Sequence, residues 1–192
     1  MRLKRLGFND RTVQINKSGD TIYEYKLWNQ VRSRCFSKSH QAKDVSYIGC
    51  SISDNFLNFT FFFNWCNNQI GFGNEGWELD KDILVKGNKI YSEDTCCFVP
   101  SELNKLLLSH RRGRGEHPIG VSYCKLNKRF RASVRKDMKK KTLGYYSTAE
   151  EAFYAYKQAK EAHIKEVANK WKDQIDIRVY EALMKYEVEI MD

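Results

Sequence analysis

The fold is decided by residues 119–146, which read IGVSYCKLNKRFRASVRKDMKKKTLGYY. In the central run, residues 129–135, apolar or small residues alternate with arginine and serine. A strand has a period of two, so this run buries its apolar set and presents its polar set on the opposite face. The polar set is Arg129, Arg131, Ser133 and Arg135. A row of guanidinium groups on a twisted antiparallel sheet fits the DNA major groove, where bidentate arginine contacts select guanine.

The neighbouring segments complete a small sheet-and-helix unit. Strands are predicted over residues 118–123, 128–136 and 142–146, because turn signals separate these three β-type runs. A capping box at residues 147–150 then opens a helix, whose apolar stripe runs from Ala152 to Trp171. The sequence therefore predicts a three-stranded antiparallel sheet packed on a helix.

Positive charge is concentrated in the same region. The net charge of the 192 residues is +9, and most of the excess lies between His110 and Lys141. That concentration favours a polyanionic partner, although a solvated basic surface would show the same composition. Glycines among arginines predict a flexible basic linker over residues 109–117. The further DNA-binding candidates are Arg111, Arg112, Arg114, Lys125, Lys128 and Lys141.

The first half of the chain contains a second segment with potential chemistry. Between Trp77 and Asn104 the pattern predicts a strand, a loop, a strand and a helix. That topology would bring Asp80 near Asn104, with Asn88 in the connecting loop. A carboxylate and an amide oxygen suit a hard cation such as Mg²⁺, which takes one or two protein oxygens and fills its shell with water and substrate phosphate. A metal ion held this way would stabilise charge on a scissile phosphate.

Four patterns in residues 25–104 resemble the phage-encoded HNH endonucleases with a ββα-metal core. They are a W-x5-RC helix (28–35), an aromatic-rich helix (53–69), the run LDKDILVKGNKIYS (79–92), and CCFV (96–99) followed by a final asparagine. The region after Gly120 resembles the Apetala-two/ERF DNA-binding domain, although it lacks that family's characteristic strand tryptophans. The combination of the two resemblances is more specific than either half alone.

The resemblance to HNH enzymes implies a role for each matching residue. Asp80 would be the first metal ligand, Asn88 the asparagine that organises the loop, and Asn104 the second metal ligand. Mg²⁺ or Mn²⁺ would be the cofactor, with no organic cofactor. The general-base histidine of the family is replaced by Lys81.

The chemistry of Lys81 leaves three alternatives. An unperturbed lysine is protonated at neutral pH, so acting as a base would need its pKa to fall by about three units. In the second alternative Lys81 binds phosphate, while Asp82 or a hydroxide on the metal ion accepts the proton. In the third alternative the site is inactive. Strand alternation would place Asp80 and Asp82 on one face and Lys81 on the other.

These patterns predict an α+β protein of two small modules. The expected divisions are an HNH-like nuclease core with N-terminal helices (1–108), a basic linker (109–117), an Apetala-two/ERF-like domain (118–172) and a C-terminal helical extension (173–192). The first hypothesis is a DNA endonuclease that cuts or nicks phosphodiester bonds. The alternative is a catalytically inactive sequence-specific DNA-binding protein, such as a regulator or an anti-defence factor. An RNA-binding or protein-interaction module fits the charge but not the double resemblance.

Further expectations concern partners and compartment. Double-stranded DNA is the expected partner, bound by a monomer or a homodimer. No signal peptide and no apolar stretch of membrane-spanning length are recognised, which predicts a cytoplasmic protein, in the host cell if a phage encodes it. The six cysteines form no CxxC pair, so they are expected to be buried thiols rather than a zinc site.

Overall fold

The structure is a computed structural model that describes residues 7–107, 116–136 and 139–190. Its contacts divide the chain into two compact units: one runs to Ser101 and includes Gln174–Val179, and the other holds Glu102–Asp173 and the residues from Tyr180 onward. Both contain helices and small sheets, which confirms the predicted α+β class. The predicted linker at 109–117 falls mostly outside the described residues.

The first unit is built around aromatic side chains on two helices. Trp28 of α1 is 2% exposed, and its indole nitrogen Nε1 donates a hydrogen bond of 2.8 Å to the carbonyl of Phe56. Phe59 packs edge-on against Tyr25 of α1. The helical elements of this unit are α1 (Tyr23–Phe36), α2 (Lys38–Lys43), the 3-10 turn η2 (Val45–Tyr47), α3 (Asp54–Leu57) and α4 (Phe59–Asn67).

The helix predicted over 53–69 is two helices, because the chain breaks at Asn58. The Ser53 side chain caps α3 by accepting from the N–H of Phe56 at 3.3 Å, and the Asn58 side chain caps α4 by accepting from the N–H of Phe61 at 3.1 Å. Phe8 forms an isolated bridge at the break: its N–H donates to the Leu57 carbonyl and its carbonyl accepts from the Phe59 N–H. This contact with a distant segment satisfies backbone groups that one continuous helix would have paired internally.

Three pairs of short strands complete the first unit. The hairpin β1 (Asn16–Lys17) and β2 (Asp20–Thr21) precedes α1. The parallel pair is β3 (Ser51–Ile52) and β5 (Ile90–Tyr91), and the antiparallel pair is β4 (Trp77–Asp80) and β6 (Cys97–Pro100). Helix α5 (Ser101–Leu107) follows β6 directly, as the predicted order of strand, loop, strand and helix requires.

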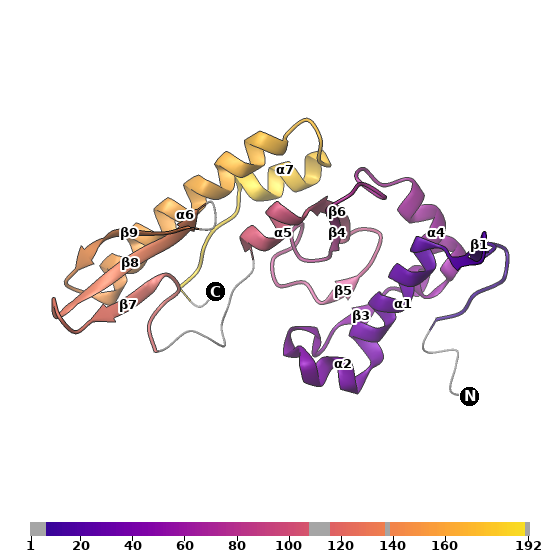
Figure 1. Ribbon diagram of the computed structural model, residues 1–192, viewed down its shortest axis with the longest axis horizontal. Coiled ribbons are helices and arrows are strands. Elements are labelled where there is room, and N and C mark those ends of the chain that lie inside the picture. The colour runs from indigo at the N-terminus through magenta and orange to yellow at the C-terminus, as the bar shows by residue number, and fades with distance from the viewer. Residues whose placement is uncertain (1–6, 108–115, 137–138, 191–192) are drawn as a thin grey trace. The chain divides into compact units, whose positions relative to one another are not determined.

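The second unit contains the predicted three-stranded antiparallel sheet, in the order β7 (Val121–Cys124), β8 (Arg129–Lys136) and β9 (Lys139–Tyr146). Helix α6 (Ala149–Trp171) lies along one face of these strands (Figure 1). Its capping box uses Thr148 and Glu151, one residue later than predicted. Helix α7 (Ile177–Met184) is shorter than the extension predicted from residue 173 onward.

The cysteines carry no disulfide: Cys124 is half-buried and the other five are buried as free thiols. Within the described ranges, no helix is long and apolar enough to span a bilayer.

Candidate functional site

Strand β8 places its apolar side chains and its arginines on opposite faces, as its alternation predicts, but Ser133, which was expected in the exposed polar set, is buried at 9% exposed. Ala132 and Val134, on the side of α6, are 0% and 6% exposed. Arg129 and Arg135, on the other side, are exposed to solvent. The register shift in the sheet leaves the alternation of β8 intact, because Ala132 pairs with Gly144 and the next residue pairs with Thr142. The extra residue of this bulge therefore lies in β9.

The face opposite α6 carries polar partners around the arginines. Residues directly paired in an antiparallel sheet point to the same side. Arg131 lies between Ser122 of β7 and Tyr145 of β9, and Arg135 pairs with Lys140. Lys140 was missed by the sequence reasoning, because only the β8–β9 register places it beside Arg135. We refer to Ser122, Arg129, Arg131, Arg135, Lys140 and Tyr145 as the basic face.

The other DNA-binding candidates occupy different positions. Lys125 and Lys128 lie in the exposed turn between β7 and β8, where Lys128 has φ of 49°. Lys141 pairs with Val134 and so belongs by register to the α6 side, although its side chain is exposed. The linker candidates Arg111, Arg112 and Arg114 lie outside the described residues.

Asp80 ends β4 and begins the loop that precedes β5. Its Oδ1 atom accepts hydrogen bonds from the N–H groups of Asp82 and Ile83, at 2.8 and 2.7 Å. Among the described residues, none donates to Oδ2. The Asp80 side chain is 8% exposed, and burial, followed by repulsion from Asp82, raises the pKa of its carboxyl from 3.8 to about 6. The two N–H donors oppose this rise by stabilising the charged form.

Lys81 is buried and paired rather than solvated. Its Nζ lies 2.9 Å from Oδ2 of Asp82, whose side chain is 46% exposed. Burial is the largest single effect and lowers the pKa of Lys81, but attraction to Asp82, with smaller contributions from Cys50 and Asp80, outweighs it and holds that pKa above its ordinary value. The interpretation of Lys81 as a general base requires the opposite shift. Because β4 ends at Asp80, the expected strand alternation through Asp82 is wrong.

Asn88 ties the two ends of this loop together. Its Nδ2 donates to the carbonyls of Lys81 at 2.6 Å and Ile90 at 2.7 Å, and its Oδ1 accepts from the N–H of Ile90 at 3.1 Å. An asparagine side chain supplies both donors and an acceptor, so one residue closes the loop.

Arg34 is a cation that the sequence reasoning did not assign to the site. Its Nη1 donates to the hydroxyl of Tyr91 at 3.3 Å, and Nζ of Lys81 lies 6.0 Å from the centre of the same ring. Two cations therefore approach Tyr91 beside the Asp80 loop. Arg34 is part of the W-x5-RC pattern, but only the folded chain brings its side chain to Tyr91 of β5.

Asn104, the predicted second metal ligand, is half-buried in α5 and belongs to the second compact unit, whereas Asp80 belongs to the first. The joint metal site of these two residues stays a prediction. In the part of the chain that the structure describes, no three His, Cys, Asp or Glu side chains gather into a metal site.

Replacing Asp80 with asparagine is expected to stabilise the metal-free protein at pH 8 by on the order of 2 kcal/mol. The pKa of Asp80 is higher in the folded than in the unfolded chain, so ionisation destabilises the fold as pH rises from about 4 through about 6. Asparagine keeps an oxygen for the two N–H donors without the buried charge. Denaturant unfolding in EDTA should show the advantage at pH 8 and its loss below pH 4. A variant less stable than the wild type at pH 8 would contradict this account.

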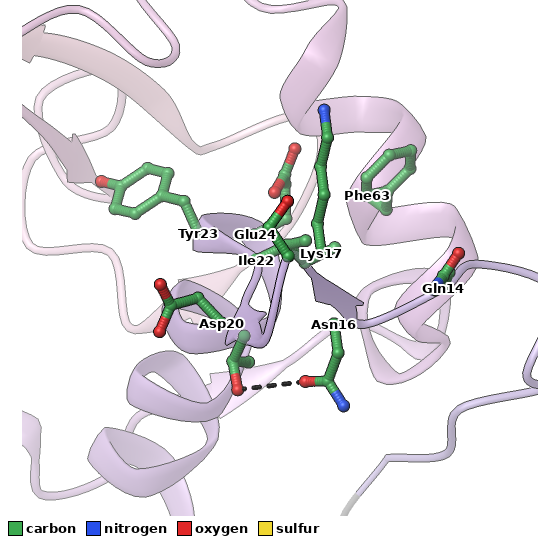
Figure 2. A pocket seen from close by; sticks show the side chains of 10 residues that line it. Gln14, Asn16, Lys17, Asp20, Ile22, Tyr23, Glu24 and Phe63 are labelled. Atoms are coloured by element: carbon green, nitrogen blue, oxygen red, sulfur yellow. Dashed lines mark hydrogen bonds between the residues drawn. The ribbon is translucent and has the colours of Figure 1, made fainter.

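A hollow of about 630 Å³ lies at the β1–β2 hairpin, the start of α1 and Phe63. Figure 2 shows Lys17 and Glu24 among the side chains that line it; the Thr21 hydroxyl, also in the lining, donates a hydrogen bond of 3.3 Å to Oδ1 of Asn16. None of the candidate site residues lines this hollow.

Comparisons with family models, with curated proteins and with solved structures found no match to this chain.

Proposed function

We propose that the chain binds duplex DNA through the basic face and cleaves it as a metal-dependent endonuclease at the Asp80 loop. The observation that carries the DNA-binding step is the separation in β8 of buried apolar residues from arginines on the opposite face. Phosphate contacts supply affinity, and arginine contacts to base edges in the major groove supply sequence preference.

The cleavage step is supported by the arrangement of Asp80. Its Oδ1 is fixed by two backbone donors, which leaves Oδ2 as the oxygen for a cation. A pKa of about 6 leaves the carboxyl mostly ionised at neutral pH, and a cation would favour the ionised form further. A bound Mg²⁺ or Mn²⁺ would supply charge stabilisation at the scissile phosphate.

Lys81 and Asp82 take separate roles in this proposal. A protonated Lys81 binds a phosphate oxygen, since its raised pKa keeps it cationic at neutral pH. The exposed carboxylate of Asp82, paired with Lys81, accepts the proton from the attacking water. Asn88 holds the loop in shape for both residues.

The second candidate is a catalytically inactive DNA-binding protein. The observation that favours it is the raised pKa of Lys81, whose pairing with Asp82 favours the protonated form. By the resemblance to HNH endonucleases, Lys81 stands where those enzymes have their general-base histidine. Both candidates predict DNA binding that weakens steeply with salt. Only the endonuclease predicts a cleaved product.

The deciding experiment incubates supercoiled plasmid with wild type, Asp80→Asn and the control Asp94→Asn, with Mg²⁺, Mn²⁺ or EDTA. Asp94 is an exposed aspartate of the same unit. We expect metal-dependent nicking or linearisation by the wild type and the control. Asp80→Asn should lose at least about a hundredfold in rate, since losing a group that only supports a metal ligand already costs roughly 10- to 100-fold.

The same variants are assayed for a gel shift, which separates binding from cleavage. Intact plasmid with every metal, together with a clear gel shift by the wild type, would reject the endonuclease and support the inactive DNA-binding protein. Equal cleavage by Asp80→Asn and wild type would remove Asp80 from the mechanism.

A further inference from the structure

The three arginines of the basic face have different environments. Arg129 and Arg135 are exposed, whereas Arg131 is half-buried between β7 and β9. Arg131 is also fixed by a side chain: the Oγ of Ser122 accepts from its Nε at 3.3 Å and from its Nη2 at 3.2 Å. The central arginine therefore has a hydroxyl partner that orients its guanidinium group, while Arg129 and Arg135 are exposed to solvent.

The geometry of this contact leaves a second donor edge available. A guanidinium carries five N–H donors in a planar fork. Ser122 occupies the edge formed by Nε and Nη2, so the terminal edge formed by Nη1 and Nη2 points beyond it. Two parallel N–H donors match the O6 and N7 acceptors of guanine in the major groove. An arginine that is already oriented loses less conformational entropy on forming that pair.

We infer that Ser122 is a positioning residue that orients Arg131, and that Arg131 supplies the base discrimination of the sheet by reading a guanine. This inference rests on the proposed DNA binding. Arg129 and Arg135 contact phosphates, because exposed cations suit a contact that requires charge rather than a fixed hydrogen-bond geometry. Ser122 thus acts on sequence preference, and the outer arginines act on overall affinity.

The test first selects preferred duplexes from a randomised pool with the wild-type protein in EDTA. Affinities for the preferred duplex and for each single-base substitution are then measured over a range of salt. The variants are Ser122→Ala, Ser122→Thr and Arg131→Lys, with Ser147→Ala as a control at an exposed serine of the same unit. Circular dichroism melting checks that each variant is folded.

Ser122→Ala should lose about fivefold or more of the discrimination at one guanine, because a good bidentate pair gives roughly 5- to 150-fold. Its salt slope should stay at the wild-type value, since every cation that faces a phosphate is still present. Ser122→Thr keeps a hydroxyl acceptor and should restore the discrimination. Arg131→Lys should lose discrimination at the same base pair, because lysine has no planar fork.

Full wild-type discrimination in folded Ser122→Ala, or loss of discrimination spread evenly over all positions, would overturn the inference. Binding by the wild type without any base preference would overturn it as well, while leaving DNA binding itself intact. Absence of salt-dependent binding by the wild type would instead overturn the proposed function.

Discussion

Replacing Arg129, Arg131 and Arg135 together with alanine is expected to weaken duplex-DNA binding by on the order of a thousandfold at moderate salt. The change removes three cations from one face of β8. The plot of log affinity against log salt should become shallower by about one unit for each phosphate that no longer has a cationic partner. Fluorescence anisotropy with a labelled duplex at several salt concentrations measures both quantities.

The matched control removes the same charge from the same unit. Lys165, Lys172 and Lys185 are exposed, and they lie on α6 and in the segments that follow α6 and α7, outside the strands of the sheet. The triple alanine variant at these lysines should keep most of the affinity. Equal losses of affinity for the two triple variants would show that net charge, rather than the basic face, determines binding. The arginine variant should still fold, because it keeps the buried Ala132 and Val134 of β8 and the ion pair of Lys136 with Glu166 of α6.

The faces of β8 could be predicted from sequence because they depend only on the period of a strand. Ala132 and Val134 alternate with Arg131, Ser133 and Arg135, so no other segment is needed to assign the two sides, whereas the burial of Ser133 depends on the rest of the fold. The contact of Ser122 with Arg131 depends instead on the register between β7 and β8. Register is set by turn geometry and by packing on α6, so a single sequence does not specify it.

Distant contacts explain where the predicted elements differ from the structure. The break at Asn58 coincides with the bridge to Phe8, a segment about fifty residues away. Local periodicity favours one helix there, and tertiary pairing overrides it. The capping box is one residue later than predicted because Ser147 and Thr148 are both good capping residues, and each has an acidic residue three positions later.

The candidate metal site was only partly accessible to sequence reasoning. The residue types suggested a cation ligand at Asp80, and the resemblance to HNH enzymes implied an organising amide at Asn88; the structure gives both side chains hydrogen bonds to the backbone. Burial of Lys81 and its pairing with Asp82 depend on how the chain turns after β4, which no strand pattern specifies. The direction of the Lys81 pKa shift therefore had to come from the folded chain.

Replacing Gly120 with alanine is expected to destabilise the second unit by about 3 kcal/mol or more. Gly120 has φ of +78°, which costs a residue with a Cβ atom, and that atom would lie 2.1 Å from Cδ2 of Tyr156. The Tyr156 ring is 6% exposed and cannot move without disturbing α6. The Gly120 carbonyl is also tied to β8, since it accepts from the N–H of Ser133 at 2.9 Å. Native-state hydrogen exchange of amides in β8 and α6 measures the decrease in stability.

Gly87 provides a control that isolates the steric part of this effect. It has the same φ of +78°, but a Cβ atom added there would meet nothing within 4 Å. Gly87→Ala should therefore cost only the backbone strain, about 1 kcal/mol, detected at amides of the first unit. In a double-mutant cycle, Gly120→Ala on a Tyr156→Ala background should also cost about 1 kcal/mol, because the ring is gone. An undiminished cost on that background would show that the destabilisation comes from the backbone of Gly120 rather than from its contact with α6.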